Sequence, residues 1–388
     1  MGNAPSSRRE GGRPGKPPAG EGARWRTATA SGAGGGGCAT PFSSPFSRFL
    51  APLGATFPAR SAEPPPVPLP APFVDRLRDI VPEDRFDAVL ATFEAPLATG
   101  FRVNTMLRDE ADTVEVLRDE GVDAEPVPGV TGAYSVPAEG RPALLASRPY
   151  ADGHIYVQNV SSQLAPIALA PRAGERVLDL CAAPGSKTGQ LSAMVGPEGE
   201  VTAVESVRPR FYKLKANVYA QGATNVLPWL GNGAVYWRRE PESFHRVLVD
   251  APCSTEGRFR AHDPETTAYW SPRKIKEMRA KQVKLLWAGV QALKPGGTLV
   301  YSTCTFAPEE NEGIISKVLR TFGDALEVVD AGLPKGGPIA EQTLPGLTGW
   351  RGKAFPDVLT QTRRVLPGDV TEGFYIAKLA KRRSTVDA

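Results

Sequence analysis

Short apolar runs alternate with amphipathic segments from about residue 155 onward. The runs are rich in Val and Leu, and they lie at 176–182, 199–206, 225–230, 246–252 and 297–305. Each run is short enough to be a buried strand, while the segments between them carry apolar residues at helical spacing. Such an alternation is typical of an α/β fold with a doubly wound, mostly parallel sheet. We therefore predict one domain of this kind over residues 151–388.

The clearest helix is predicted between the last two of these runs, over 271–297. Pro272 suits its first turn, and Pro295-Gly296-Gly297 is expected to stop it. Its apolar side chains share one face and are Ile275, Met278, Val283, Leu286, Trp287, Val290 and Leu293.

A smaller unit is predicted before the sheet domain. Residues 73–93 have helical apolar spacing interrupted by Pro82, which predicts two short helices. A strand near 100–107, a helix ending at Gly121 and short strand patterns follow. We predict a small α+β domain over residues 73–150.

The first part of the chain, residues 1–72, has a different composition. Gly, Pro, Ala, Ser and Arg dominate it, and it ends in the stiff polyproline stretch EPPPVPLPAP. Such a segment buries too little apolar surface to offset its ordering entropy, so we predict a disordered tail and linker. Its basic bias resembles a transit peptide, and MGNAPS fits a myristoylation pattern. A mistaken start codon or a plain disordered tail is preferred to either.

Composition excludes several classes of protein. The 388 residues are 41% hydrophobic with a net charge of +4, which indicates a soluble globular protein. No apolar stretch approaches the ~18 residues of a membrane span, so none is expected. Four cysteines are too few for a disulfide framework, which indicates a reducing compartment, the cytoplasm. The three histidines lack metal-ligand spacing with cysteine, so no metal is expected.

Residues able to bind a ligand follow the predicted strands. In doubly wound sheets, ligands bind at the carboxyl ends of the strands. The small residues of 181–187, CAAPGSK, would let a ligand approach the backbone at the start of a helix, although an ordinary strand–turn–helix corner has the same pattern. Glu205 ends the second strand, where an acid can accept two ribose hydroxyls. Taken alone, a solvated loop glutamate is the simpler interpretation.

Two cysteines occupy comparable positions at the ends of two strands. Asp250 and Cys253 leave one predicted strand, and Cys304 leaves another. A single cysteine is usually a small core residue. Two of them beside Asp, Ser and Thr rather than aliphatic residues favour a reactive site.

Three motifs together resemble those of a known enzyme family. LDLCAAPGSKT, DAPCSTEGRFR and YSTCTFAPEENEGII are similar to motifs of the RNA cytosine-C5 methyltransferases of the NOP/Sun family, most closely its RsmF-type branch. FRVNT, YVQNVSSQL and RRVLPGDVTEGFYIAKL also match, so the resemblance covers about 75–385. It implies a Rossmann-like class I methyltransferase fold, S-adenosylmethionine as cofactor and a cytosine in RNA as acceptor.

The resemblance also implies which residues bind the cofactor. They are Cys181, Ala182, Ala183, Pro184, Gly185, Ser186, Lys187, Glu205, Asn232 and Asp250. Glu205 would hold the ribose, and Asp250 would lie near both cofactor and target base. Asn232 stands where the family usually has an aspartate near the adenine, and Gly368 stands where related chains often carry a histidine. The roles of these two positions are therefore open.

Covalent catalysis is the chemistry that the resemblance implies. Carbon 5 of cytosine is a poor nucleophile, and addition of a thiolate to carbon 6 raises its electron density. Cys304 would be that nucleophile, Asp250 would hold the base at N3, and Cys253 would assist loss of the carbon-5 proton. The alternative is attack by Cys253, because DNA cytosine methyltransferases use the cysteine of a Pro-Cys motif.

Basic residues lie close in sequence to the predicted site. They are Arg208, Arg210, Lys213, Lys215, Arg258, Arg260, Arg273, Lys274, Lys276, Arg279, Lys281 and Lys284. Such a stripe suits a phosphate backbone, although helices often carry solvated charges. We expect RNA as the partner, with rRNA favoured slightly over tRNA, an unpaired or flipped cytosine, and a monomeric enzyme. By resemblance, the 73–150 domain would help to grip the RNA.

Two other classes of function are alternatives to an RNA methyltransferase. A non-catalytic RNA-binding or ribosome-assembly factor could use the same fold, but the motifs are intact except at Asn232. A methyltransferase for small molecules or proteins would have no use for two strand-end cysteines in direct transfer to oxygen or nitrogen. We therefore favour the RNA enzyme.

Overall fold

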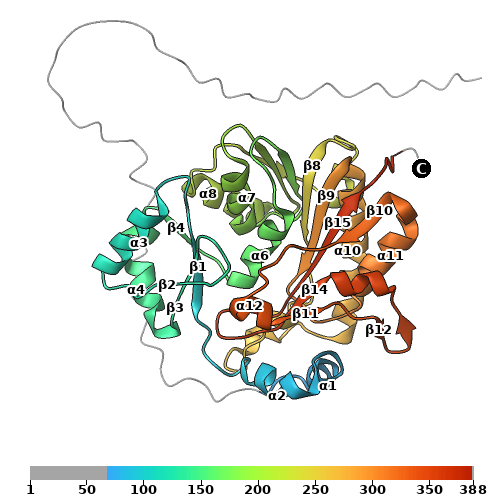
Figure 1. Cartoon of the computed structure of the whole chain (residues 1–388), viewed down its shortest axis with the longest axis horizontal. Helices are drawn as coiled ribbons and strands as arrows, with labels where there is room; N and C mark the ends of the chain where they lie inside the picture. Colours follow the sequence, from blue (N-terminus) through green and yellow to red (C-terminus); the bar gives the residue numbers. More distant parts are fainter. Residues whose placement is uncertain (1–67, 387–388) are drawn as a thin grey trace, which may run out of the picture. The chain divides into compact units, whose positions relative to one another are not determined.

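A nine-stranded mixed sheet forms between residues 176 and 381 (Figure 1). The structure describes residues 68–386 of the chain. In this computed structural model the strand order is β11-β14-β15-β9-β8-β5-β6-β7, and β10 also pairs with β15. The predicted disordered tail lies outside the described residues as far as residue 67.

Five neighbouring strands of the sheet are parallel, as the sequence predicts. They are β5 (Arg176–Asp179), β6 (Glu200–Glu205), β7 (Val226–Leu230), β8 (Phe244–Asp250) and β9 (Leu293–Thr303). The chain adds β6 and β7 on one side of β5, then β8 and β9 on the other. The topological switch point, where ligands bind in such sheets, therefore lies between β5 and β8.

The C-terminal strands depart from this parallel pattern. β15 (Phe374–Lys381) runs antiparallel to β9, and its other edge pairs antiparallel with β14 (Arg363–Val365) and β10 (Leu326–Val329). β11 (Thr343–Pro345) completes the edge. The short connection from β14 to β15 permits an antiparallel return, whereas a parallel crossover needs about a dozen residues or more. The short elements nearby are α12 (Gly337–Glu341), β12 (Gly349–Trp350) and β13 (Lys353–Ala354).

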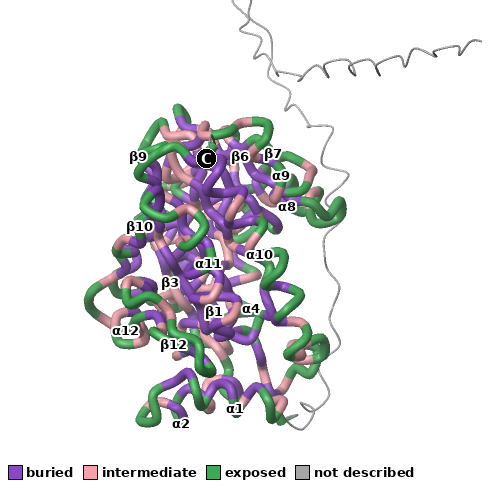
Figure 2. The backbone as a smooth tube through the Cα atoms, turned by 90° about the vertical axis from the view of Figure 1, so that its right-hand side faces the viewer, coloured by how far each residue is buried: buried purple, intermediate pink, exposed green. Residues whose placement is uncertain are grey.

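Helices cover both faces of the sheet. One face packs against α6 (Val160–Leu169), α7 (Ser186–Val195) and α8 (Arg208–Ala220), and the other against α9 (Gly233–Tyr236), α10 (Pro272–Ala292) and α11 (Glu312–Phe322). Val177 and Leu248 point to the first layer, while Leu178 and Val247 point to the second. This alternation is the period of two that a strand imposes. Burial is accordingly concentrated along the strands (Figure 2).

The long helix α10 ends earlier than predicted. Its last residue is Ala292, and the Pro-Gly-Gly sequence expected to stop it lies within β9. The fully buried ammonium of Lys381 donates to the carbonyls of Val290 and Leu293, each at 2.8 Å, and pairs with Glu242 at 2.7 Å. Burial lowers the pKa of Lys381, and Glu242 opposes that shift. A distant lysine thus satisfies the carbonyls at the helix terminus.

A second sheet forms most of the N-terminal part. Its order is β2-β3-β1-β4, all antiparallel. Its elements are β1 (Thr99–Val103), β2 (Glu125–Pro126), β3 (Ala133–Val136), β4 (Ile155–Val157), α3 (Glu110–Asp119), α4 (Arg141–Ala146) and α5 (Arg148–Ala151). The predicted helix and strands are present, but the sheet continues past the predicted boundary at residue 150, because Ile155 pairs with Val103.

The first two helices pack elsewhere. α1 (Ala71–Ile80) and α2 (Glu83–Ala91) break at Pro82 as predicted. The ring of Phe73 lies 4.8 Å from that of Phe259 and 6.3 Å from that of Phe306, which belong to loops after β8 and β9. The residues predicted as one unit over 73–150 therefore divide between two packing environments, because an amphipathic pattern does not specify its partner.

A buried arginine connects the N-terminal sheet to the large sheet domain. Arg102 in β1 is 4% exposed, and it donates to the side chains of Gln158 and Gln221 and to the carbonyl of Ser186 at 3.5 Å. Burial lowers its pKa to about 10. Gly189 in α7 is required beside it, since a Cβ there would lie 2.0 Å from the Gln221 amide oxygen.

Glu310 is a fully buried carboxyl group behind the loop that follows β8. It accepts hydrogen bonds from the Ser254 amide at 3.1 Å and from the Gln282 side chain at 2.7 Å, and its Oε1 has no partner among the described residues. Burial raises its pKa to about 8 despite these bonds.

Within residues 68–386, no helix is long and apolar enough to cross a bilayer.

Glu310→Gln is expected to stabilise the protein increasingly as the pH rises from 5 to 8. Because the folded-state pKa of Glu310 is raised, the wild type holds a proton that its unfolded chain releases, and its stability falls with rising pH. The variant lacks this proton, so the difference should grow by up to about 1.4 kcal/mol per pH unit. Urea unfolding at three pH values measures it.

Glu309→Gln serves as the control for this experiment. Glu309 pairs with Arg76 at 2.7 Å, and its pKa is lowered. Its contribution to stability is complete above the ordinary carboxyl pKa, so this variant should lose a constant amount between pH 5 and 8. A constant difference for Glu310→Gln as well would contradict the buried neutral carboxyl group.

Candidate active site

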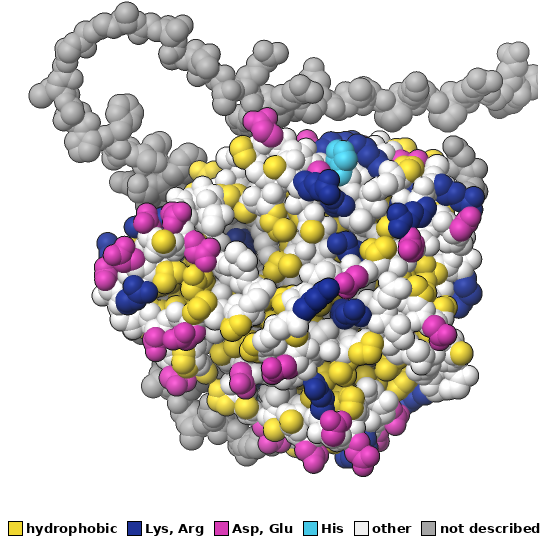
Figure 3. Space-filling model, viewed as in Figure 1, with side chains coloured by type: hydrophobic (Ala, Val, Ile, Leu, Met, Phe, Trp, Pro, Cys, Tyr) yellow, Lys and Arg dark blue, Asp and Glu magenta, His cyan; other side chains and the backbone are white. Residues whose placement is uncertain are grey.

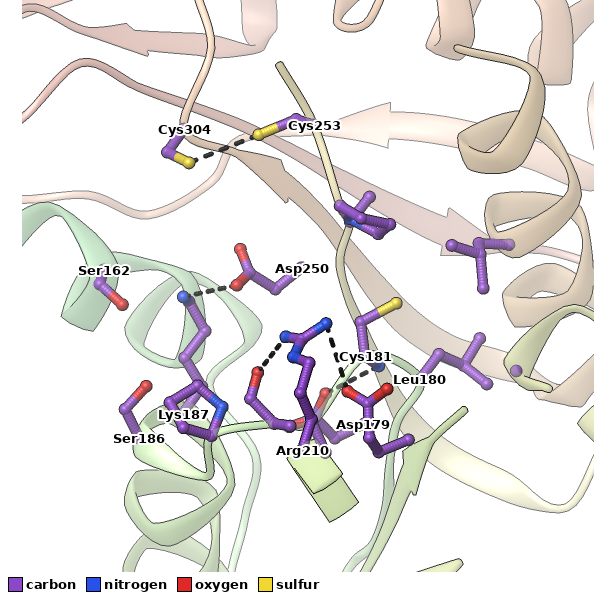
Figure 4. A pocket seen from close by; sticks show the side chains of 18 of the residues that line it. Ser162, Asp179, Leu180, Cys181, Ser186, Lys187, Arg210, Asp250, Cys253 and Cys304 are labelled. Atoms are coloured by element: carbon purple, nitrogen blue, oxygen red, sulfur yellow. Dashed lines mark hydrogen bonds and ion pairs between the residues drawn. The ribbon is translucent and has the colours of Figure 1, made fainter. Parts of the chain in front are cut away.

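A cavity of about 840 Å³ opens at the carboxyl ends of β5, β6 and β8. It lies at the topological switch point of the sheet. Figure 4 shows Cys253 and Cys304 at one end, Asp179 and Cys181 at the other, and Asp250 between them. The cavity therefore joins the small-residue loop after β5 to the two cysteine loops.

The two thiols are neighbours across parallel strands. Asp250 lies opposite Ser302 in the register of β8 and β9, so the loops that follow leave the sheet side by side. The Sγ atoms of Cys253 and Cys304 are 3.4 Å apart, with Cys253 buried and Cys304 partly exposed. The hydrogen bond to Cys304, together with burial, raises the pKa of the Cys253 thiol well above its ordinary value. The Cys253 thiol is therefore held in its protonated form.

Polar contacts fix the two cysteine loops to each other. The Gly257 amide donates to the carbonyl of Cys304 at 3.0 Å. The buried carboxylate of Glu256 accepts from the Thr305 hydroxyl at 2.8 Å and from the Phe306 amide at 3.1 Å. Each loop thus depends on the other for its geometry.

Asp250 is held from two sides. Lys187 Nζ in α7 lies 2.7 Å from Oδ2, and the Ser302 hydroxyl in β9 donates to Oδ1 at 2.8 Å. Lys187 is itself mostly buried. The carboxylate is consequently fixed in orientation between the two ends of the cavity (Figure 4).

Asp179 ends β5 beneath the loop 181–187. It accepts hydrogen bonds from the Thr188 hydroxyl at 2.8 Å and from the Cys181 amide at 3.3 Å. Burial raises the pKa of Asp179 to about 6, against the opposing effect of the Thr188 bond. Burial, and then the charge of Asp179, also raises the pKa of the Cys181 thiol, which therefore stays protonated.

Glu205 and Asn232 line the same cavity at the ends of β6 and β7. Glu205 Oε1 accepts the Val207 amide at 2.7 Å, and Oε2 lies 3.5 Å from Arg210. The carbonyl oxygen of the Asn232 side chain accepts the Ala234 amide at 3.0 Å and caps α9. The NH₂ group of Asn232 is the part left to face a ligand.

The cavity contains nearly every site residue that the sequence predicts. Eleven of them line it: Cys181, Ala182, Ala183, Pro184, Ser186, Lys187, Glu205, Asn232, Asp250, Cys253 and Cys304. Gly185 instead sits at the start of α7 with a φ of 108°, a conformation that favours glycine. Gly368 is not among the lining residues; a Cβ there would approach Gln342.

Several lining residues were not singled out from the sequence. They include Asp179, Ser162, Glu372 and Phe374. Asp179 could have been found, because it directly precedes the small-residue loop. Phe374 begins the antiparallel strand β15 and Glu372 lies in the segment before it, and the sequence pattern does not reveal that β15 lies beside β9.

The predicted basic stripe divides into two groups. Arg210, Arg258, Lys281 and Lys284 line the cavity, and the other residues of the stripe do not. Ion pairs occur in both groups, since Lys274 and Lys281 pair with Glu277, and Arg258 and Arg260 pair with Glu372. Lys and Arg side chains also lie on the face seen in Figure 3, interspersed with acidic and apolar ones. Part of the predicted stripe therefore borders the cavity, close to acids that pair with it.

S-adenosylmethionine fits the charge and size of this cavity. It carries a sulfonium and an ammonium group, and the carboxylates of Asp179, Glu205 and Asp250 end three adjacent strands there. The volume of about 840 Å³ lies within the range of small-molecule sites. Residues 68–386 hold no cluster of three potential metal ligands.

Two family models match the chain. That of the 16S rRNA methyltransferase RsmB/F matches residues 166–380, and that of the N-terminal domain of 16S rRNA methyltransferase RsmF matches residues 69–160. The two matches together cover nearly all the described residues.

Curated relatives and solved structures give the same result. The chain is 34% identical to the ribosomal RNA small subunit methyltransferase F of Serratia proteamaculans, over 83% of this chain and 65% of that one. The Escherichia coli protein of the same name is also 34% identical, over 81% and 64%. This chain therefore spans slightly less than two thirds of the length of these relatives.

Among solved structures, a methyltransferase homologue from Pyrococcus horikoshii has a TM-score of 0.67 at 30% identity, covering 81% of this chain and all of that one. NSun6 from Pyrococcus horikoshii, solved with SFG, has a TM-score of 0.67 at 18% identity, over 81% and 99%. At that identity, the second likeness concerns the fold.

These matches confirm the class I methyltransferase fold and S-adenosylmethionine as the cofactor. They also confirm the resemblance that the three motifs carry, since both the sheet domain and the N-terminal segment match one family. The chain belongs to the RsmB/F family of 16S rRNA methyltransferases.

Proposed function

We propose that this protein forms 5-methylcytosine in RNA, with small-subunit rRNA as the substrate. The observation that carries the proposal is the pair of thiols 3.4 Å apart beside the fixed carboxylate of Asp250. Methyl transfer to oxygen or nitrogen needs no thiol, whereas transfer to carbon 5 of cytosine needs a covalent nucleophile.

Cys304 is the nucleophile in this proposal. Its thiolate would add to carbon 6 of cytosine and so raise the electron density at carbon 5. Two observations support Cys304 over Cys253: Cys304 is the more exposed of the two, and the pKa of the Cys253 thiol is raised well above its ordinary value by its hydrogen bond and by burial. Cys253 as the attacking residue is the alternative that the experiments below distinguish.

Cys253 would act after methyl transfer. Carbon 5 then carries both a methyl group and a proton, and that proton must leave before carbon 6 can release Cys304. The Cys253 sulfur is within 3.4 Å of the Cys304 sulfur, close enough to take part in removing the proton. Without this assistance, the covalent adduct would persist.

Asp250 and Lys187 would position the reacting base. The carboxylate of Asp250 is fixed by Lys187 and Ser302, so it can accept a hydrogen bond from cytosine protonated at N3 without reorganising during the reaction. S-adenosylmethionine supplies the electrophilic methyl group when it is bound. The loop 181–187 and Glu205 would hold its methionine and ribose parts.

Small-subunit rRNA is preferred to tRNA because both family models and the curated relatives are named for it. The cations at the rim, Arg258, Lys281 and Lys284, would contact the phosphate backbone on either side of an extruded cytosine. The N-terminal sheet, which resembles the N-terminal domain of RsmF, would add to the RNA-binding surface.

Cys304→Ala is expected to abolish methylation of unmodified small-subunit rRNA, because it removes the thiol that adds to carbon 6 in this proposal. Cys253→Ala is expected to bind RNA covalently and release it slowly, since the adduct then lacks the group that assists its breakdown. Methyl incorporation and a mobility shift on denaturing gels measure the two outcomes.

Cys181→Ala is the matched control, since this thiol lines the cavity away from the pair and is held protonated. It should leave no stable adduct. An adduct in Cys304→Ala, and none in Cys253→Ala, would reverse the two roles.

The affinity for S-adenosylmethionine is expected to rise as the pH increases from 5 to 7. The pKa of Asp179 is about 6 in the free protein, and a cationic ligand favours its ionised form. Asp179→Asn should weaken binding by about 10- to 100-fold at pH 7.5, the value of a hydrogen bond to a charged group. It should also flatten the pH dependence. Titration calorimetry measures both.

Asn232→Ala provides the comparison, because Asn232 lines the cavity without carrying a charge. It should weaken binding at all pH values and leave the slope unchanged. A slope that persists in Asp179→Asn would assign the pH dependence to another group.

A further inference from the structure

Arg258 lies on the rim of the cavity beside the thiol pair. It ends the short 3₁₀ turn 256–258, in which the Gly257 amide binds the carbonyl of Cys304. Its side chain lines the cavity, is 60% exposed and lies 3.3 Å from the carboxylate of Glu372. Arg258 therefore adjoins the residue whose amide binds the proposed nucleophile, and its guanidinium pairs with an acid.

The position of Glu372 is fixed by its backbone. The Glu372 amide donates to the Ser161 hydroxyl at 3.0 Å, and that hydroxyl donates to the Glu372 carbonyl at 2.8 Å. These two bonds hold the backbone of Glu372 in place. The adjacent Gly373 packs so tightly against the turn that a Cβ on Gly257 would lie 2.1 Å from the Gly373 carbonyl oxygen. The carboxylate also pairs with Arg260 at 3.4 Å.

We propose that Arg258 and Glu372 set how readily Cys304 ionises: Arg258 favours the thiolate, and Glu372 weakens that effect by pairing with Arg258. Both are positioning residues that act on the nucleophile through charge. The inference rests on the proposed function of Cys304. It adds two residues to Cys304, Cys253 and Asp250, the three to which that function assigns catalytic roles.

Charged and titratable groups face this region from every neighbouring element. They are Lys187 from α7, Asp250 from β8, Cys253 and Arg258 from the loop after β8, Lys281 and Lys284 from α10, Glu310 from the loop before α11, and Glu372 from the segment before β15. Lys187 is paired with Asp250, Lys281 is paired with Glu277, and Glu310 is buried with a raised pKa. Arg258 differs from the other cations because it directly follows Gly257, whose amide binds the carbonyl of Cys304.

The electrostatics of Arg258 support this arrangement. The charge of Glu372, and after it that of Cys304, raises the pKa of Arg258. Opposite charges attract each other mutually, so in this proposal the guanidinium favours the thiolate form of Cys304. Arg260 shares Glu372, but its pKa is lowered by burial and it does not line the cavity. Solvent at the rim limits the effect in the free protein.

Alkylation of Cys304 by iodoacetamide, read by peptide mass spectrometry between pH 6 and 10, tests the proposal. In Arg258→Gln, the pH of half-maximal rate should rise by about half a unit, the size of a partly screened charge interaction. In Glu372→Gln it should fall. Arg258→Lys should restore most of the wild-type profile, and Arg260→Gln should leave it unchanged.

Equal profiles for Arg258→Gln and Arg260→Gln, or an upward shift in Glu372→Gln, would overturn the proposal. If Arg258→Gln does not fold, as judged by circular dichroism, the fall expected for Glu372→Gln and the unchanged profile expected for Arg260→Gln decide it. The assay uses neither RNA nor cofactor. If the pH of half-maximal alkylation shifts as expected but the protein methylates no RNA, the proposed function fails while this inference stands.

Discussion

The register between β8 and β9 is the constraint on which the site depends. Because Asp250 lies opposite Ser302, the two loops that follow begin at the same edge of the sheet and bring two sulfurs within 3.4 Å. A shift of one residue would turn each side chain to the other face. The apolar residues of these strands, buried on both faces by helices, hold the register and thereby the chemistry.

Charge accounts for how the two ends of the cavity differ. Three acids at strand ends form a site suited to a cationic cofactor, and burial leaves Asp179 with a pKa of about 6. At the other end, cations border the thiol pair, where the proposed mechanism requires a thiolate. Asp250 connects the two ends because Lys187 from the cofactor loop and Ser302 from β9 both hold it. The fold thus places an acidic end and a cation-bordered end in one cavity, with the carboxylate of Asp250 between them.

Local sequence pattern was sufficient to predict the parallel strands and several of the strand-end residues that line the cavity. Each of these follows from the period of apolar residues and from the rule that ligands bind at strand ends. Contacts between distant segments could not be predicted in the same way. The packing of α1 on Phe259, the capping of α10 by Lys381 and the pairing of Arg258 with Glu372 depend on tertiary structure. The positions of Asn232 and Cys304 were predicted, whereas their roles remain proposals.

The most direct test of covalent catalysis uses small-subunit rRNA that contains 5-fluorocytidine. Fluorine at carbon 5 cannot leave as a proton does, so a thiolate that adds to carbon 6 remains attached after methyl transfer. Tandem mass spectrometry of the protease-digested complex is expected to locate the modified pyrimidine on Cys304. Attachment to Cys253, or methylated RNA with no protein bound, would contradict the account.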